Sequence, residues 1–138
     1  MELEIKAFIP MKVESINKFL YAYSGYKRSP KRGGRWCPFN YKYIKYYKKW
    51  EKALKLFFPK QDNPPGQKKK LIISLYKRRR LYDQQNFIAG AKPIVDILVK
   101  LNYFQDDSVK WIDIEYHQYL IDKKSNQEEG TLIEIYKI

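Results

Sequence analysis

Between Asn40 and Phe58, large apolar side chains recur at steps of four, three, four and three residues. This spacing predicts one helix with a single apolar face, which Pro59 ends. We interpret the face as core; stacking on nucleic-acid bases is the alternative interpretation. A helix of this kind needs a second apolar surface to cover it. The apolar face comprises Tyr43, Tyr47, Trp50, Leu54 and Phe57.

Four other segments supply that surface, because apolar and polar residues alternate along them as in half-buried strands. They are Glu2–Ile9, Lys70–Lys77, Val109–Ile121 and Thr131–Ile138. A second helix, with Ile94, Ile97, Leu98 and Leu101 on one face, starts near Asn86 or Pro93. The order predicts one α+β domain over residues 1–138, in which about four strands form a mixed or antiparallel sheet packed against two helices.

Several classes of protein are excluded early. The longest apolar runs fall far short of the roughly 20 residues that a membrane span needs, and the acidic N-terminus is unlike a signal peptide. Cys37 is the one cysteine, so no internal disulfide forms, and a single histidine leaves too few ligands for a Cys/His zinc site. We expect Cys37 to be a packing residue in a cytoplasmic protein, in a reducing setting and with no membrane partner.

The charge is large and unevenly distributed. Lys and Arg number 28 against 15 Asp and Glu, which gives a net charge of +13. Residues 1–82 hold 22 bases and 5 acids, a net of +17, whereas residues 83–138 hold 6 bases and 10 acids, a net of −4. Such a charge favours a polyanionic partner, with nucleic acid first and an anionic membrane surface or an acidic protein as alternatives. Solvated faces and chance are the simplest alternative explanation of the asymmetry.

Three basic segments are candidates for contacting phosphates. A Pro- and Gly-rich loop over residues 24–38 is predicted to be mobile, the helix from Asn40 carries lysines away from its apolar face, and an Arg run follows the Lys70–Lys77 strand. The predicted DNA-binding residues are Lys27, Arg28, Lys31, Arg32, Arg35, Lys45, Lys48, Lys49, Lys52, Arg78, Arg79 and Arg80.

Carboxylates follow these basic residues in the sequence, at Asp83, Asp96, Asp106 and Asp107. Hard cations such as Mg²⁺ bind a few carboxylates together with water and substrate phosphate. A metal held there, beside Lys92, would make a nuclease-like site that activates water against a phosphodiester. A simple acidic turn at Asp106-Asp107 and an i,i+4 ion pair between Lys92 and Asp96 are the structural alternatives.

The ordered motifs resemble the RusA family of Holliday-junction resolvases. They are a strand entering an Arg run, a D-x-x-N element at Asp83…Asn86, a K-x-x-x-D-x-L helix from Lys92 to Leu98, and a D-D-S turn before a strand. The resemblance covers most of the chain and fits a phage-type branch, with Lys92 six residues after Asn86. It implies a homodimer that binds four-way DNA junctions and cuts two opposing strands symmetrically with Mg²⁺, in recombination and repair, without a small-molecule cofactor. Mn²⁺ is expected to substitute.

The resemblance assigns metal binding to Asp83 and Asp107, and catalysis to these two and Lys92. Gln85 stands where the family has its second aspartate, so this position brings an amide oxygen without charge. Gln85 and Asp106 are further candidate ligands, Asp106 having a turn-capping role as its alternative.

Roles for the remaining residues follow from charge and position. Lys92 would stabilise negative charge at the phosphate, with Asp96 supporting it. Asn86 would either orient a ligand or, as we favour, cap the second helix. We expect the lone His117 to be structural rather than a general base.

Two other functions stay open at this point. One is a non-catalytic basic protein that binds DNA or RNA, for which the loss of an acid at Gln85 is an argument. The other is a structure-specific nuclease for flaps or forks.

Overall fold

The computed structural model describes residues 1–16, 19 and 38–138. One sheet has the strand order β1-β4-β2-β3, in which β1 and β2 pair antiparallel with β4, and β2 pairs in parallel with β3. The mixed sheet confirms the expected fold class. Its strands are β1 (Glu2–Ile9), β2 (Lys69–Lys77), β3 (Ile112–Leu120) and β4 (Gly130–Lys137).

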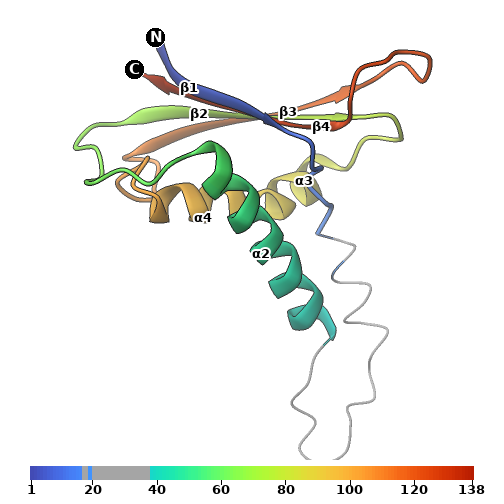
Figure 1. Cartoon of the computed structure of the whole chain (residues 1–138), viewed down its shortest axis with the longest axis horizontal. Helices are drawn as coiled ribbons and strands as arrows, with labels where there is room; N and C mark the ends of the chain where they lie inside the picture. Colours follow the sequence, from blue (N-terminus) through green and yellow to red (C-terminus); the bar gives the residue numbers. More distant parts are fainter. Residues whose placement is uncertain (17–18, 20–37) are drawn as a thin grey trace, which may run out of the picture.

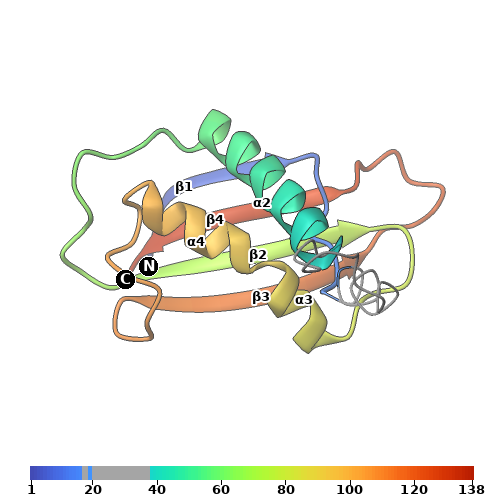
Figure 2. The same cartoon turned by 90° about the horizontal axis from the view of Figure 1, so that it is seen from below.

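The described helices all cover one face of this sheet, and no other described residues form a layer on the opposite face (Figures 1 and 2). They are α2 (Pro38–Phe57), α3 (Gln84–Gly90) and α4 (Lys92–Lys100). The expected second helix is therefore two helices, α3 and α4, which meet at Ala91. Pro93 stands in the first turn of α4, where its missing N–H costs no helical hydrogen bond.

The core lies between the sheet and the helices. Leu71, Ile73 and Leu75 of β2 are fully buried, which confirms the face predicted from their alternation. From the helical side, Trp50 of α2 and Ile94 of α4 are fully buried as well. Their side chains remove apolar surface from water, and this burial is the main stabilising contribution.

The apolar face of α2 is rotated from the predicted one near its end. Phe57 is 42% exposed, whereas Phe58, just beyond the last helical residue, is fully buried. The Phe58 amide still donates to the Leu54 carbonyl at 2.7 Å, so the chain continues the helical path for one more residue. With 3.6 residues per turn, Leu54 and Phe58 share a face that Phe57 leaves.

The third strand begins later than predicted. Val109 is 84% exposed and lies in a turn, because the amides of Trp111 and Ile112 both donate to the carbonyl of Ser108. The ladder with β2 starts at Ile112, opposite Lys69. The strand was predicted to begin at Val109 because the residues from there on are mostly apolar or β-branched. The hydrogen bonds of residues 108–112 close a turn instead.

Tyr46 and Gly90 join α2, α3 and the segment after β1. The Tyr46 hydroxyl donates to the Gly90 carbonyl at 2.6 Å and accepts from the Glu14 amide at 3.0 Å. A Cβ at position 90 would lie 1.7 Å from the Glu14 carbonyl oxygen. Only glycine at position 90 permits the backbone of α3 to approach the backbone at Glu14 this closely.

Among the described residues, no helix combines the length and apolar character that crossing a membrane requires. The predicted mobile loop over 24–38 lies outside the described residues, except for Pro38, where α2 begins.

Candidate functional site

Lys92 and Asp96 project from α4 on its exposed side. The opposite side of this helix is apolar and buried through Ile94, Ile97 and Leu98. Because residues four apart lie on the same helix face, burial of the apolar side leaves Lys92 and Asp96 together at the surface. Their side chains are 60% and 30% exposed, respectively.

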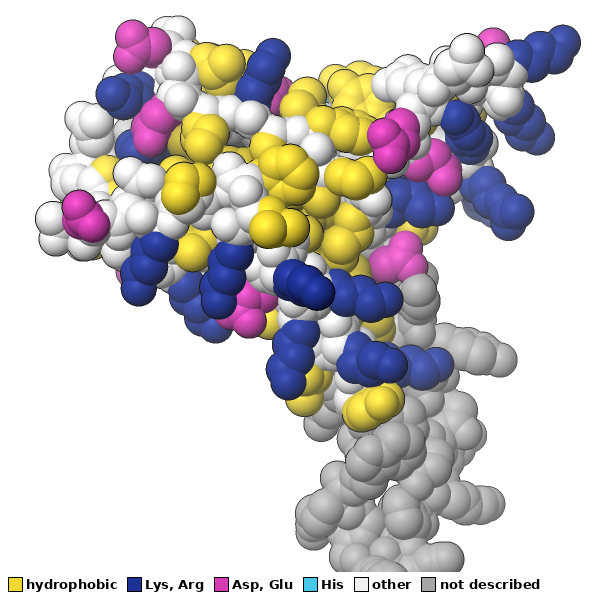
Figure 3. Space-filling model, in the orientation of Figure 1, with side chains coloured by type: hydrophobic (Ala, Val, Ile, Leu, Met, Phe, Trp, Pro, Cys, Tyr) yellow, Lys and Arg dark blue, Asp and Glu magenta, His cyan; other side chains and the backbone are white. Residues whose placement is uncertain are grey.

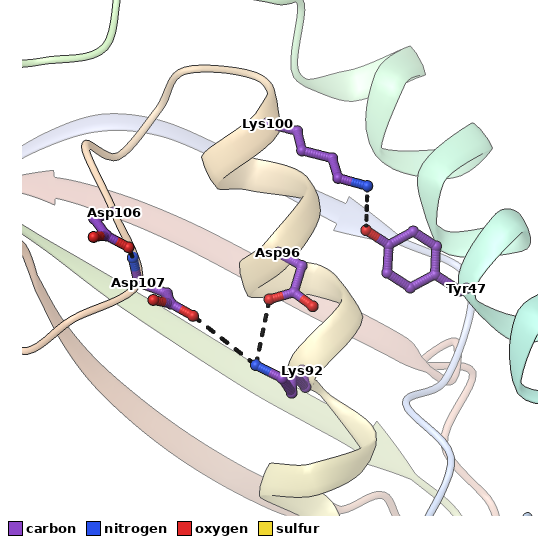
Figure 4. Close-up of polar contacts among 6 residues, drawn as sticks. All are labelled: Tyr47, Lys92, Asp96, Lys100, Asp106 and Asp107. Atoms are coloured by element: carbon purple, nitrogen blue, oxygen red, sulfur yellow. Dashed lines mark hydrogen bonds and ion pairs between the residues drawn. The ribbon is translucent and has the colours of Figure 1, made fainter.

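Asp107 reaches the same place from the loop after α4. The Lys92 Nζ lies 3.5 Å from Oδ1 of Asp96 and 3.9 Å from Oδ2 of Asp107 (Figure 4). Exposed ion pairs of this kind contribute little to stability. The structure thus gathers three of the predicted residues into an accessible cluster that the fold does not depend on.

The loop that carries Asp107 is anchored at its start. Asn102 has a positive φ of 66°, a conformation that asparagine tolerates after a helix end, and its side chain donates to the Gln61 carbonyl at 2.8 Å. Tyr103 is buried and donates to the Pro59 carbonyl at 2.5 Å. These contacts fix the path of the chain toward Asp107.

Asp106 accepts a hydrogen bond from the Asp107 amide at 2.6 Å through Oδ1. This is the turn-capping role that we considered as the alternative to metal binding. The second carboxylate oxygen of Asp106 has no hydrogen bond within the described residues, so both roles are compatible with the geometry.

Asp83 and Gln85 stand at the beginning of α3. Asp83 occupies the N-cap position without a side-chain capping bond, and Gln85 is exposed in the first turn. Gln85 precedes Lys92 by seven residues, across the junction of α3 and α4 at Ala91. In the described part of the chain, neither side chain forms a hydrogen bond or an ion pair with Lys92, Asp96 or Asp107.

Asn86 does not cap the helix, contrary to our expectation. α3 already begins at Gln84, because Asp83 takes the capping position, and Asn86 lies inside the first turn. Its backbone carbonyl accepts from the Ile16 amide at 3.2 Å, which ties α3 to the segment after β1. From the sequence we considered only Asn86 as the cap, although aspartate is as common as asparagine at this position.

Gln118 positions the chain just before Asp83, a role that the sequence analysis missed. Its side chain accepts from the Tyr82 amide at 2.9 Å and donates to the Tyr82 carbonyl at 3.1 Å. The Gln84 side chain, in turn, donates to the Tyr116 carbonyl at 3.3 Å. The sequence did contain a signal for this role, because Gln118 is a polar residue on the otherwise apolar side of β3 that faces the helices.

The part of the chain that the structure describes does not form a closed cage of ligands for a metal. Among the described residues, no three His, Cys, Asp or Glu side chains are grouped closely enough to hold an ion. Mg²⁺, however, commonly takes one or two carboxylates and completes its shell with water and substrate phosphate. The exposed carboxylate of Asp107 fits that incomplete type of site.

The three arginines after β2 differ in their surroundings. Arg78 is tied to the β3–β4 loop: its amide donates to Glu129 Oε2 at 2.6 Å, and its guanidinium donates to the carbonyls of Ser125 and Gln127. The Arg78 amide and Lys12 hold the pKa of Glu129 below its usual range. Arg79 and Arg80 are exposed. The guanidinium of Arg78 is therefore held by the β3–β4 loop.

The predicted basic residues of α2 are exposed on the side away from the core (Figure 3). They are Lys45, Lys48, Lys49 and Lys52. A further lysine, Lys100 at the end of α4, donates to the Tyr47 hydroxyl at 2.9 Å, which raises its pKa. The predicted DNA-binding residues Lys27, Arg28, Lys31, Arg32 and Arg35 lie outside the described residues.

His117 lies on the opposite face of the sheet from the cluster of Lys92, Asp96 and Asp107. The neighbouring Tyr116 packs edge-to-face on Phe87 of α3, so alternation along β3 directs His117 to the uncovered face. There its Nε2 lies 3.0 Å from Glu115 Oε1. Lys70 and, secondarily, His117 lower the pKa of Glu115.

No protein-family model matches the chain, and no curated protein or solved structure matches it.

Proposed function

We propose that this chain is a Mg²⁺-dependent endodeoxyribonuclease that resolves four-way DNA junctions as a homodimer, by paired symmetric nicks, in recombination and repair. One observation carries the proposal: an exposed ammonium, that of Lys92, lies between carboxylates of α4 and of the following loop on a protein of net charge +13. Cationic, metal-binding and phosphate-binding groups are the components that phosphodiester hydrolysis needs together.

Lys92 would act on the phosphate by direct electrostatics. Its side chain is 60% exposed and its ion pairs are long, so the ammonium can exchange a carboxylate for a phosphate oxygen at small cost. It would then stabilise the negative charge that develops on the phosphate and on the departing oxygen. Asp96, one turn away, is the positioning residue that holds Lys92 over the site.

Asp107 and Asp83 would hold the Mg²⁺, with Asp106 and the amide oxygen of Gln85 as additional donors. When bound, the metal supplies an activated water and stabilises charge on the phosphate. Gln85 contributes no charge, so this site would bind the metal more weakly than one with an additional carboxylate. Mn²⁺ would substitute, because it accepts the same oxygen ligands.

The DNA would be held by basic side chains on two parts of the protein. Arg79 and Arg80 follow β2, and the lysines of α2 lie along an exposed helix. Phosphate contacts of this kind position the duplex without reading its sequence. Two copies would present two sites to opposing strands of a junction, in the cytoplasm of a bacterium or a phage-infected cell.

Cleavage of defined DNA substrates tests the proposal. The protein is incubated with a labelled four-way junction, a flap, a fork and a linear duplex, each with Mg²⁺, Mn²⁺ or EDTA. We expect symmetric nicks in the junction with either metal and none with EDTA. Tight junction binding without cleavage in either metal would indicate a non-catalytic binding protein. Faster cleavage of flaps or forks would reassign the substrate.

A further inference from the structure

A pocket of about 390 Å³ lies between α2 and the segment that follows β1. Its volume falls in the range of pockets that hold small molecules, and it is separate from the cluster around Lys92. The residues that line it are Met11, Lys12, Glu14, Phe19, Lys42, Lys45, Tyr46 and Lys49.

The floor of this pocket is aromatic and fixed in place. The rings of Phe19 and Tyr46 are buried, with their centroids 4.9 Å apart, and Tyr43 packs on Phe19 in an edge-to-face arrangement at 5.6 Å. The Tyr46 hydroxyl is held by the backbone at both Glu14 and Gly90. Phe19 and Tyr46 are 2% and 6% exposed, so the apolar surface that a ligand would meet is small, but it is already ordered.

The rim of the pocket is strongly basic. Lys42, Lys45 and Lys49 are spaced by three and four residues, so one face of α2 presents all three, and Lys12 adds a fourth cation from the other wall. The described residues of the lining include four lysines and one glutamate, a net charge of +3 among them. Lys12 lies 3.4 Å from Glu129, whereas the α2 lysines are exposed to solvent.

We propose that this pocket takes one unpaired nucleotide of a DNA strand, with its base on the apolar floor and its flanking phosphates on the lysine rim. The pairing of a small apolar floor with several cations suits a nucleotide, because a base is largely apolar on its faces and each phosphate carries a negative charge. The inference rests on the proposed function and gives it a substrate feature: the branch point of a junction, where base pairs open, supplies such a nucleotide. Free nucleotides share this chemistry, and the test separates the two sources.

Photochemical cross-linking in EDTA tests the pocket without any cleavage. A 4-thiothymidine is placed once as a single-nucleotide bulge in a duplex and once in the fully paired duplex, and cross-linked peptides are mapped by mass spectrometry. We expect the bulged probe to cross-link at Met11, Phe19 or Tyr46 and the paired probe not to. Mononucleotide dTMP at millimolar concentration should leave the cross-link in place, because it lacks the neighbouring phosphates. Full displacement by dTMP would overturn the assignment to DNA and favour a free nucleotide.

Matched double variants on the same helix separate the pocket from general phosphate binding. Lys45→Gln/Lys49→Gln removes two rim cations, and Lys48→Gln/Lys52→Gln removes two from outside the lining. We expect the wild type to prefer the bulged over the paired duplex about tenfold, because the base enters the pocket only when its flanking phosphates are held on the lysine rim. The first variant should lose this preference, and the second should keep it while binding both duplexes more weakly.

An equal loss of preference in both variants, or cross-links elsewhere in the chain, would overturn the pocket assignment. Junction cleavage without a pocket cross-link would overturn this inference alone. A pocket cross-link in a protein that cuts no junction would support the inference and contradict the proposed cleavage.

Discussion

Lys92 and Asp107 come from separate elements, the first turn of α4 and the loop that follows it, yet their charged atoms lie 3.9 Å apart. Asp96 lies 3.5 Å from the same ammonium. All three side chains are at least 30% exposed, so their association contributes little to the stability of the fold. The cluster is therefore available to a ligand.

Replacing Lys92 by methionine should reduce the rate of junction cleavage by about 10²-fold, the size expected when one charged group is lost from a site that stabilises a transition state. Single-turnover cleavage in Mg²⁺ measures this. Lys100→Met, at the other end of α4, removes the same charge outside the cluster and should leave the rate within about threefold of the wild type. Equal losses in the two variants would assign the effect to overall charge.

Gly90→Ala should destabilise the protein, because the added Cβ would lie 1.7 Å from the Glu14 carbonyl oxygen. Overpacking of this kind costs about 1–3 kcal/mol, which exceeds the helix propensity that alanine gains. Urea unfolding measures the loss. Gly66→Ala is the control, since a Cβ there has nothing within 4 Å. A Gly90→Ala protein as stable as the control would contradict the close backbone approach.

Arg78→Gln should lower the free energy of unfolding by about 1–2 kcal/mol, because the variant loses the guanidinium contacts to the carbonyls of Ser125 and Gln127. Hydrogen exchange should rise in residues 122–129. Arg79→Gln changes an exposed neighbour and should leave stability unchanged while reducing the salt dependence of DNA binding by about one counterion. If the two variants were equally stable, Arg78 would not anchor this loop.

The ion pair of Lys70 with Glu115 predicts a pH-dependent contribution to stability. Lys70, and then His117, lower the pKa of the Glu115 carboxyl in the folded state. The ionised Glu115 carboxylate therefore stabilises the fold at pH values above its ordinary pKa of about 4.3. This contribution is lost as the pH falls through the lower pKa of the folded state.

The difference in Tm between the wild type and Lys70→Met measures that contribution. It should be largest near pH 7 and should shrink below about pH 4, where the carboxylate becomes protonated. Lys68→Met, which removes an exposed charge just before β2, corrects for the general relief of positive charge. A difference that stays constant from pH 7 to pH 3 would show that Glu115 does not stabilise the fold through Lys70.

The sequence predicted most of the fold because burial on one face leaves a regular pattern. The bounds of β1 and the buried face of β2 are as expected. Errors arose where local hydrogen bonds override composition: Val109 lies in a turn closed at Ser108, and Asn86 lies inside a helix that Asp83 begins. The parallel pairing of β2 with β3 depends on contacts across the whole chain, which spacing does not encode.

The candidate site was predicted in part. The i,i+4 relation of Lys92 and Asp96 is visible in the sequence, and the structure adds Asp107 to them. Two contacts could not be predicted, that of Arg78 with the β3–β4 loop and that of Gln118 with the chain at Tyr82. The partners in these pairs are separated by 47 and 36 residues. Only folding brings such partners together.

The most direct test of the central claim compares Asp107→Asn with Asp113→Asn in cleavage of a four-way junction with Mg²⁺. Both variants remove one exposed carboxylate, but Asp113 lies in β3, outside the cluster. We predict that Asp107→Asn binds the junction as tightly as the wild type and cuts it at least about 10²-fold more slowly, whereas Asp113→Asn cuts at nearly the wild-type rate. Robust cleavage by Asp107→Asn would contradict the account.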